Sequence, residues 1–451
     1  MSNHPPLATN HSPPNTLSLL ELIAWLGILA FSFCMESARG TTPASEQESF
    51  PQVSSKKGLL VEDLQDFAHL GIKHATVNVN LASLIDPHPT GEKAAQPQWN
   101  YRGQAYFFHE SAVQQLDHRI KLLSDAGALV YLILLAYESG NAETNRILLH
   151  PDYDPACPTH LGALHSVTPA GRDWLAATIE FLAARWSRPD QPYGRVVGYI
   201  VGNEVNSHWW WSNCGHTTMQ QFADHYFAAL RIIYDAVRSQ TSGSRVYVSL
   251  EHHWSIRYPA GDESQAFPGK DFLEHLAKLS QTDKRGDFPW NIAYHPYPEN
   301  LFYPRFWIDE TAVDSPDSPR ITFKNLQVLT EFLKRPEMLY DGHPRRVILS
   351  EQGFHAPDGH EGEQLQAAAY CYAYRKVAAT DGIDAFIYHR HLDDPDEGGR
   401  RLGLRTRNPA DHSPGEKRKI YKCFRAADTP QWREAFEFAL PIVGLESWPE
   451  Q

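Results

Sequence analysis

The sequence lacks the short motifs that most often hold metals or nucleotides. None of its five cysteines forms a C-x-x-C pair and no H-E-x-x-H is present, which argues against a zinc-thiolate site and a zinc-peptidase helix. No G-x-G-x-x-G follows a strand-like segment, so a dinucleotide-binding fold has no support. We therefore expect neither a catalytic metal nor an organic cofactor.

Basic charge is scarce as well. Lys and Arg number 41 against 54 Asp and Glu, which gives a formal net charge of −13. Because nucleic-acid binding depends on a basic surface, this balance argues against that class of partner. The hydrophobic share of 42% allows a large core, and 451 residues fit a single barrel-type domain with long loops.

The first part of the chain has a composition of its own. Leu17 to Phe33 is apolar apart from three residues, the length of a signal-peptide core or a marginal membrane span. No Lys or Arg precedes Arg39, which departs from a standard leader. We predict a signal peptide or membrane anchor over residues 1–35, a flexible polar linker over 36–55, and a protein exported to the periplasm or the outside, with a membrane tether as the alternative to a cleaved leader.

From residue 56 onward, strand-like and helix-like segments alternate. Eight apolar, β-branched runs read as buried strands: 57–60, 74–80, 128–136, 197–205, 245–253, 290–297, 346–354 and 384–391. The helical periodicity predicts eight helices between and after them: 61–70, 111–126, 171–186, 218–239, 271–279, 322–334, 363–379 and 431–439.

Strict alternation of this kind predicts right-handed crossovers and a parallel sheet. Eight units can close into a (β/α)8 TIM barrel, and the long loops after strands, such as 137–169, would build a site on one face. We predict an α/β fold with this barrel over residues 56–451 and long βα loops. An open, doubly wound sheet is the structural alternative. A hairpin is expected over 99–108, turning at Arg102-Gly103.

Two of the predicted strands end in a glutamate. VGYIVGNEV carries Glu204 at the end of the fourth strand, and RVILSEQGF carries Glu351 at the end of the seventh. The carboxyl ends of barrel strands are where this fold places its chemistry, and two carboxylates there suggest work on a glycosidic bond. The alternative is a structural ion pair inside the barrel.

This arrangement resembles a known group of enzymes. An Asn-Glu pair, here Asn203-Glu204, on strand four and a second Glu, here Glu351, on strand seven is the signature of the clan A retaining glycoside hydrolases. GNEVN, AYHPY and SEQGF also resemble a bacterial family known as domain of unknown function 5722. The resemblance implies that Glu204 is the general acid/base and Glu351 the nucleophile, with their carboxyl groups about 5–5.5 Å apart. Asn203 would hydrogen-bond the sugar hydroxyl next to the anomeric carbon.

Five further residues are candidates for substrate binding. His295 and Tyr297 match the His-x-Tyr that the clan carries on strand six, with Tyr297 orienting the nucleophile; a buried core network is the competing interpretation. Trp209, the first of three adjacent tryptophans, is a candidate sugar platform or simply part of the loop packing. Strand eight departs from the clan, because Tyr388 and His389 stand where a Trp is usual, so the sugar is not identified.

Together these features predict a retaining glycoside hydrolase that cleaves O-glycosidic bonds of poly- or oligosaccharides. Two alternatives stay open: a non-catalytic carbohydrate-binding barrel and a metal-dependent hydrolase. Cys157 and Cys214 fall in predicted loops on the same face, where they could pair or remain free.

Overall fold

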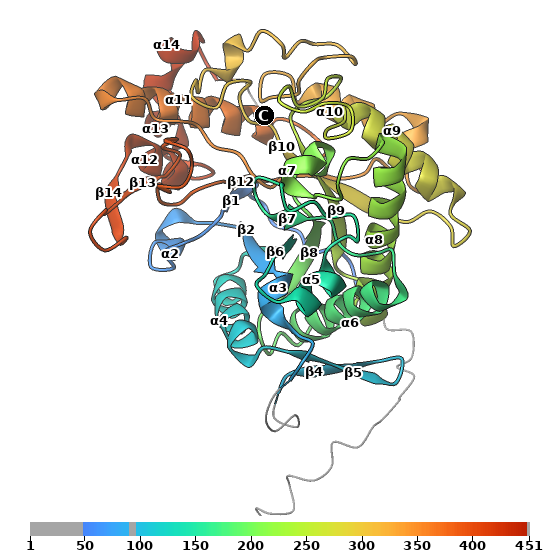
Figure 1. Ribbon diagram of the computed structural model, residues 1–451. Coiled ribbons are helices and arrows are strands. Elements are labelled where there is room, and N and C mark those ends of the chain that lie inside the picture. Colours follow the sequence, from blue (N-terminus) through green and yellow to red (C-terminus); the bar gives the residue numbers. More distant parts are fainter. Residues whose placement is uncertain (1–47, 90–95, 449–451) are drawn as a thin grey trace, which may run out of the picture. The chain divides into compact units, whose positions relative to one another are not determined.

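The computed structural model describes residues 48–89 and 96–448, and the structural statements below concern those residues (Figure 1). The predicted leader, 1–35, and most of the predicted linker lie outside this range, so the expectations about export and a membrane tether stay predictions. Within the two described ranges, no helix combines the length and apolar character needed to cross a bilayer.

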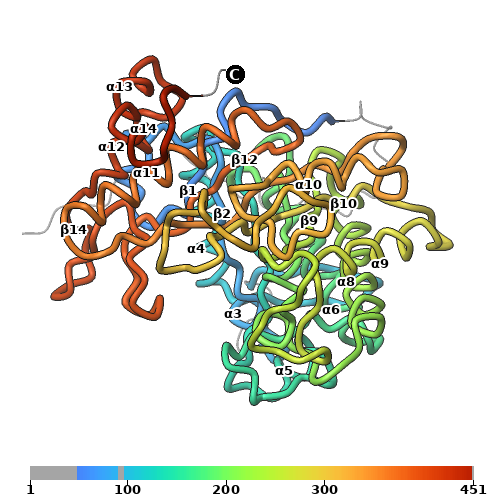
Figure 2. Tube along the Cα trace, turned by 90° about the horizontal axis from the view of Figure 1, so that it is seen from above, coloured from blue at the N-terminus to red at the C-terminus, as the bar shows by residue number. Residues whose placement is uncertain are grey.

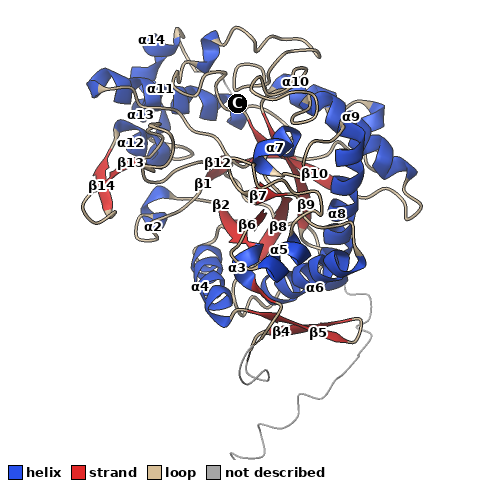
Figure 3. Ribbon diagram, in the orientation of Figure 1, coloured by secondary structure: helices blue, strands red, loops and turns tan. Residues whose placement is uncertain are grey.

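The centre of the molecule is a closed barrel of eight parallel strands, which confirms the predicted (β/α)8 fold. Each strand pairs with the next in chain order, and the last pairs with the first. The strands are β1 (Lys57–Leu59), β2 (His74–Asn80), β6 (Leu129–Tyr137), β8 (Val196–Val201), β9 (Arg245–Glu251), β10 (Trp290–His295), β11 (Val347–Leu349) and β12 (Ile383–Tyr388). Figure 3 shows these strands between the surrounding helices, and Figure 2 gives the view from above.

The apolar runs form strands here because both faces of the sheet are covered. One face packs into the barrel interior, where the side chains include Tyr131, Ile133, Ile200, Tyr247, Ala293, Ile348 and Ile387. The other face packs against the helices in a second, larger cluster. Alternate residues of one strand therefore belong to different clusters, and this alternation decides which side chains can reach a site inside the barrel.

Seven longer helices and helix fragments cover the outside of the barrel: α4 (Glu110–Asp125), α6 (Pro169–Trp186), α8 (Met219–Gln240), α9 (Gly269–Thr282), α10 (Gln327–Phe332), α11 (Gly359–Ala378) and α12 (Lys419–Ala426). Thr218 begins α8 with a capping box, because its hydroxyl accepts from the backbone of Gln221 while the Gln221 side chain accepts from the backbone of Thr218. Gly71 and Gly127, both with positive φ, end the elements before β2 and β6 as predicted.

Two predicted helices are much shorter than expected. Only α2 (Phe67–Leu70) forms within 61–70, and only α10 forms within 322–334. In the first segment the Asp63 carboxylate accepts a hydrogen bond from the backbone N–H of Gln65. In the second segment the side-chain oxygen of Asn325 accepts one from the backbone N–H of Thr322. Such local side-chain bonds compete with the helical ladder and hold these segments as turns.

Several elements, most of them short, were not predicted from the sequence. They are α3 (Leu81–Leu84), β3 (Ile85–Asp86), α5 (Ala142–Leu148), β7 (Leu161–Gly162), α7 (His208–Trp211), β13 (Arg405–Arg407), β14 (Pro414–Lys417), α12 and α14 (Leu440–Val443), and the predicted helix 431–439 begins as α13 (Trp432–Phe436). The predicted hairpin is present as β4 (Gln98–Tyr101) and β5 (Gln104–Phe108). Its turn residues Arg102 and Gly103 both have positive φ.

Residues 48–55, the end of the predicted linker, pack against the amino-terminal end of the barrel. Phe50 packs against the interior cluster, and the Arg245 guanidinium lies 3.7 Å from its ring centroid. Glu48 forms an ion pair with Arg195, and its backbone N–H donates to Ser242 at 3.0 Å. The folded unit therefore begins upstream of residue 56, because these side chains close the barrel from below.

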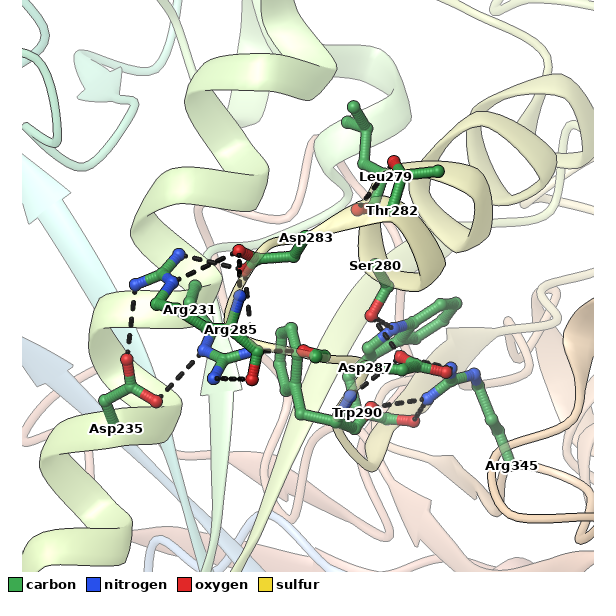
Figure 4. Close-up of polar contacts among 12 residues, drawn as sticks. Arg231, Asp235, Leu279, Ser280, Thr282, Asp283, Arg285, Asp287, Trp290 and Arg345 are labelled. Atoms are coloured by element: carbon green, nitrogen blue, oxygen red, sulfur yellow. Dashed lines mark hydrogen bonds and ion pairs between the residues drawn. The ribbon is translucent and has the colours of Figure 1, made fainter.

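The loop from α9 to β10 is fixed by charged contacts (Figure 4). Arg231 of α8 contacts Asp283 at 3.5 Å, and Arg345, just before β11, contacts Asp287 at 3.2 Å. The Arg345 guanidinium also lies 3.8 Å from the ring centroid of Trp290. These contacts tie two helices and two strands together at the start of β10, the end opposite to the predicted site.

The cysteines make no disulfide in the part of the chain that the structure describes. Cys157 and Cys214, for which the sequence left pairing open, are both buried and free. The Cys157 thiol lies 3.7 Å from the carbonyl oxygens of Leu161 and Trp210. Burial raises the pKa of the Cys214 thiol to about 12, which keeps it protonated and unreactive.

Candidate active site

Glu204 lies in a tight turn at the carboxyl end of β8. The strand ends at Val201, Gly202 has φ of 75°, and Glu204 itself has φ of 40°. A non-glycine residue in this left-handed region is strained, and such residues often occur at functional sites. Ser249 of β9 accepts a hydrogen bond from the Glu204 backbone N–H at 3.0 Å, which holds the turn against the neighbouring strand.

Glu351 lies at the corresponding end of β11. The Tyr297 hydroxyl donates to Glu351 Oε1 at 3.2 Å, and His389 Nε2 lies 4.0 Å from the same oxygen. The Glu351 side chain is 23% exposed and that of Glu204 is 13% exposed. Both carboxylates are therefore largely desolvated yet still reachable from solvent.

His295 joins the two sides of the site. Its Nδ1 lies 2.9 Å from Glu204 Oε1, and its Nε2 lies 3.0 Å from the hydroxyl of Ser350, the residue before Glu351. One oxygen of Glu204, one oxygen of Glu351 and one ring nitrogen of His295 all lie within 4.8 Å of one another. The two glutamates predicted to work together thus meet at the carboxyl ends of the strands.

The surroundings push the pKa values of the two carboxyl groups apart. Burial raises the pKa of Glu204, and the charge of Glu351 adds to this effect against the opposing hydrogen bond with His295. Burial would also raise the pKa of Glu351, but the charges of His389 and His295 outweigh it and lower that pKa. Two carboxyl groups separated in this way can act as an acid and an ionised base or nucleophile.

The pKa of His295 also depends on the charges of the two glutamates. Burial acts to lower its pKa, but the charges of Glu351 and Glu204 outweigh burial and raise it. The pKa values of Glu204 and His295 are both raised and their atoms are hydrogen-bonded, so the two groups titrate as a linked pair.

The comparisons with known proteins were made against families, curated proteins and solved structures. The family of unknown function DUF5722 matches residues 49–451, nearly the whole described chain. The chain belongs to this family. No curated protein matches it. The family's description names no activity.

Solved structures similar to this DUF5722 member are glycoside hydrolases. A family 39 glycoside hydrolase from the gut symbiont Bacteroides cellulosilyticus WH2 shares 15% identity, with 83% of this chain and 64% of that chain covered and a TM-score of 0.50. A β-glucosidase from Pyrococcus furiosus shares 17% identity, with 84% and 87% covered and a TM-score of 0.50. At these identities the likeness shows the fold alone, a (β/α)8 barrel.

A third neighbour gives the same result. The family 1 β-glucosidase from Thermotoga maritima, solved in complex with isofagomine lactam, shares 12% identity, with 80% of this chain and 84% of that chain covered and a TM-score of 0.50. This chain spans less than two thirds of the family 39 enzyme, so that enzyme's whole activity is not transferred to it.

The remaining predicted site residues fall into two groups. Asn203 is half-buried beside Glu204, and its side chain makes no hydrogen bond to any residue in the described ranges. His389 lies beside Glu351, with its Nε2 also 3.2 Å from Glu397. These two are thus placed where the sequence analysis expected them.

Trp209 and Tyr388 are not brought to the site. Trp209 is buried in the loop packing, with its ring centroid 4.6 Å from that of His216, whereas Trp211 packs against the interior cluster. Tyr388 is fully buried on the outer face of β12, and its hydroxyl donates to the carbonyl of Leu402 at 2.9 Å. Of the three adjacent tryptophans, Trp211 is the one that packs against the interior cluster.

A buried carboxylate that the sequence analysis overlooked supports the Glu204 turn. Glu251, at the end of β9, accepts from Asn206 Nδ2 at 2.6 Å, from the Ser207 hydroxyl at 3.1 Å and from the backbone N–H of His253 at 2.8 Å. His253 Nδ1 lies 2.5 Å from the second Glu251 oxygen. Burial opposes ionisation of Glu251, but His253 outweighs it and lowers the pKa to about 2. Glu251 ends an apolar, strand-like run, and this pattern could have identified it from the sequence.

A second overlooked group surrounds Glu351. Glu397, from the long loop after β12, accepts from Arg390 Nε at 2.7 Å and from Arg400 Nη2 at 3.2 Å. Tyr137, at the end of β6, packs on the interior cluster, and burial together with the charge of Glu351 raises the pKa of its hydroxyl. Only the fold brings Tyr137 and Glu397 near Glu351, since both lie far from it in the sequence.

Two groups of side chains have ligand-type atoms close enough to hold a metal ion: Glu204 with His295 and Glu351, and Glu251 with His252 and His253. In the first group, both ring nitrogens of His295 already have hydrogen-bond partners. In the second, both Glu251 oxygens are hydrogen-bonded, and His252 Nδ1 lies 2.9 Å from the carbonyl oxygen of Tyr297. These donor sets are arranged as hydrogen-bonded networks.

Proposed function

We propose that the protein is a retaining glycoside hydrolase that cleaves O-glycosidic bonds of oligo- or polysaccharides. The observation that carries the proposal is the approach of a Glu204 oxygen and a Glu351 oxygen to within 4.8 Å. Retaining enzymes hold their two carboxyl groups about 5–5.5 Å apart, whereas inverting enzymes need about 6.5–9.5 Å to admit a water molecule between them. The short separation favours the double displacement.

In the first step, the ionised Glu351 attacks the anomeric carbon and forms a covalent glycosyl ester. The bond from that carbon to the leaving oxygen breaks, and a proton from the linked pair of Glu204 and His295 moves to the leaving oxygen. In the second step, Glu204 removes a proton from water, the resulting hydroxide attacks the same carbon, and Glu351 leaves as a carboxylate. Two inversions at one carbon give net retention.

The neighbouring residues support these roles. The hydroxyl of Tyr297 donates to Glu351 and orients the attacking carboxylate, while His389 Nε2 lies 4.0 Å from the same oxygen. His295, fixed by Ser350, positions the proton for Glu204. Asn203, with its amide unpaired next to Glu204, is placed to bind the sugar hydroxyl beside the anomeric carbon.

The decisive experiment replaces Glu351 with Ala and assays aryl glycosides and polysaccharides. Turnover should be abolished, and azide should restore it with a product of inverted configuration, because the small anion enters the space left by the carboxylate. Glu331→Gln, on the exposed face of α10, is the matched control and should retain full activity. Unchanged turnover in Glu351→Ala would remove the proposal.

The same assays separate the two alternatives. A non-catalytic binding barrel would bind glycans and leave them intact, and it would bind them equally well as Glu351→Ala. A metal-dependent hydrolase would lose activity on dialysis against a chelator and regain it with added metal. An enzyme that uses the double displacement of Glu204 and Glu351 would keep its activity after the same dialysis.

A further inference from the structure

A cavity of about 610 Å³ lies where β1 and β2 separate, and we call it the slot. Its lining includes Leu60, Thr76, Asn78, Val79, Arg119 and Arg390. Sites for small organic ligands occupy about 300–1,000 Å³, so this volume is large enough for sugar units. The catalytic roles proposed above use none of these residues.

The slot exists because the barrel wall is open at this point. β1 and β2 share a single register pair, Gly58 with His74, whereas β2 and β6 share seven, from His74 with Leu129 to Asn80 with Leu135. Beyond Gly58 the two strands are no longer paired. The slot therefore lies beside the unpaired part of β2 and reaches α4, whose Ala112, Leu116 and Arg119 also line it.

Two β2 side chains in the slot face the barrel interior. Thr76 pairs in register with Tyr131 and Asn78 with Ile133, and paired residues of parallel strands point to the same face. Tyr131 and Ile133 belong to the interior cluster. Asn78 is nonetheless exposed, which is unusual for an interior position and follows from the open wall beside it.

Unsatisfied polar groups also point to a ligand. The Thr76 hydroxyl is fully buried and has no hydrogen-bond partner among the described residues, and Arg119 Nε is also buried and unpaired there. Buried polar atoms are normally hydrogen-bonded, so a donor or acceptor from outside the chain is expected. The Asn78 amide likewise makes no hydrogen bond to another described side chain or backbone group.

Contacts of Arg390 link the lining of the slot to the residues around Glu351. This residue lines the slot and bonds Glu397, which contacts His389 beside Glu351. The charge of Arg390 also acts on the Glu351 carboxylate. A chain of sugars with one unit at Glu351 could therefore extend past Arg390 toward β2.

We propose that the slot is a sugar subsite that holds a second, uncharged unit of the same substrate, an inference that rests on the proposed glycosidase function. Thr76, Asn78 and Arg119 supply hydrogen bonds for hydroxyl groups, and Leu60 and Val79 supply apolar contact for a ring face. The slot favours a neutral sugar over a uronic acid, because Arg390 is already paired with Glu397 and with Asp394 at 3.0 Å, and because the Glu62 carboxylate, whose charge acts on Arg119, also lines the slot.

The test compares chain-length dependence in two variants. Asn78→Leu fills the slot, and Thr76→Val removes one hydroxyl while keeping the shape. Thr178→Val is the matched control, because Thr178 on α6 is another buried threonine whose hydroxyl lacks a described partner. The probes are aryl glycosides of cello-, xylo- and manno-oligosaccharides with one to four sugar units, assayed for release of the aryl alcohol with active protein and for binding by calorimetry with Glu351→Gln.

We expect the unmodified protein to bind and cleave a longer oligomer about tenfold better than the one-unit compound, since each added hydrogen bond contributes about that factor. Asn78→Leu should abolish this gain, Thr76→Val should reduce it, and neither should change the rate with the one-unit compound. Cleavage with an unchanged length preference in both variants overturns the subsite and leaves the glycosidase proposal standing. Slot-dependent binding without cleavage supports the subsite and overturns the glycosidase. If the unmodified protein binds none of the probes and cleaves none of them, both the subsite and the glycosidase proposal are overturned.

Discussion

Replacing Glu251 with Gln is expected to destabilise the protein in a way that depends on pH. The Glu251 carboxylate is 7% exposed and accepts hydrogen bonds from Asn206, Ser207 and His253. An amide of the same shape keeps one acceptor oxygen but turns an N–H₂ group toward donors of His253. The substitution therefore removes a negative charge and leaves a buried donor facing another donor.

The magnitude follows from the pKa of Glu251. His253 lowers it from 4.5 to about 2 in spite of burial. Since the folded-state pKa lies below the unfolded one, the contribution to stability is complete above pH 4.5 and is lost as the pH falls through 2. At about 1.4 kcal/mol per tenfold change in the acid constant, it amounts to about 3 kcal/mol at pH 7 and about 2 kcal/mol at pH 3.5.

The assay is guanidinium-induced unfolding of the unmodified protein and of Glu251→Gln, followed by circular dichroism at pH 7 and pH 3.5. The free energy of unfolding should fall by about 3 kcal/mol at pH 7 and by less at pH 3.5. Glu331→Gln, which removes an exposed carboxylate paired with Lys334, should change it by less than about 0.5 kcal/mol at either pH. A cost for Glu251→Gln that is equal at both pH values would refute the reasoning.

Three further results are expected in an activity assay. Tyr297→Phe should lower kcat/KM by about 10- to 100-fold without unfolding the protein, because it deletes a hydrogen bond to the charged Glu351. The pH profile of kcat/KM should be a broad bell, because the lowered pKa of Glu351 places the acid limb below 4.5 and the raised pKa values of Glu204 and His295 place the basic limb above their ordinary range. Trp211→Ala should raise KM more than it lowers kcat, as measured by steady-state kinetics, and an unchanged KM would argue against contact with the sugar.

The barrel could be predicted from the sequence because each strand is an apolar run buried on both faces. The same runs placed Glu204 and Glu351 at strand ends, and closure of the ring was then enough to bring them together. The roles of His295 and Tyr297 came from a resemblance, yet both also occupy the end of a buried strand. The local sequence was therefore enough to predict those site residues that lie at the ends of strands.

The sequence could not decide which of several neighbouring side chains faces inward. Tyr388 and His389 are adjacent, and strand alternation allows only one of them to point toward Glu351. The tryptophans at 209 and 211 share one helical turn, so the angle at which the loop enters that turn decides which of them covers the barrel interior. That angle depends on long-range contacts, such as the hydrogen bond from the backbone N–H of Trp209 to the carbonyl of Gln265.

Glu397 was missed for a related reason. It belongs to a long polar loop with no periodic pattern, and its partners His389 and Arg390 become neighbours only when the loop folds back. Loops of this kind carry much of the specificity in barrel enzymes and are the least determined by local propensity.

Phe50 sets a practical limit on where the protein can be shortened. A recombinant fragment that starts at Lys56 would lack this ring and the ion pair of Glu48 with Arg195. The guanidinium of Arg245 would lose the aromatic surface on which it rests, and water would enter the interior from below. A truncation intended to remove only the predicted leader should therefore keep the residues from Glu48 onward.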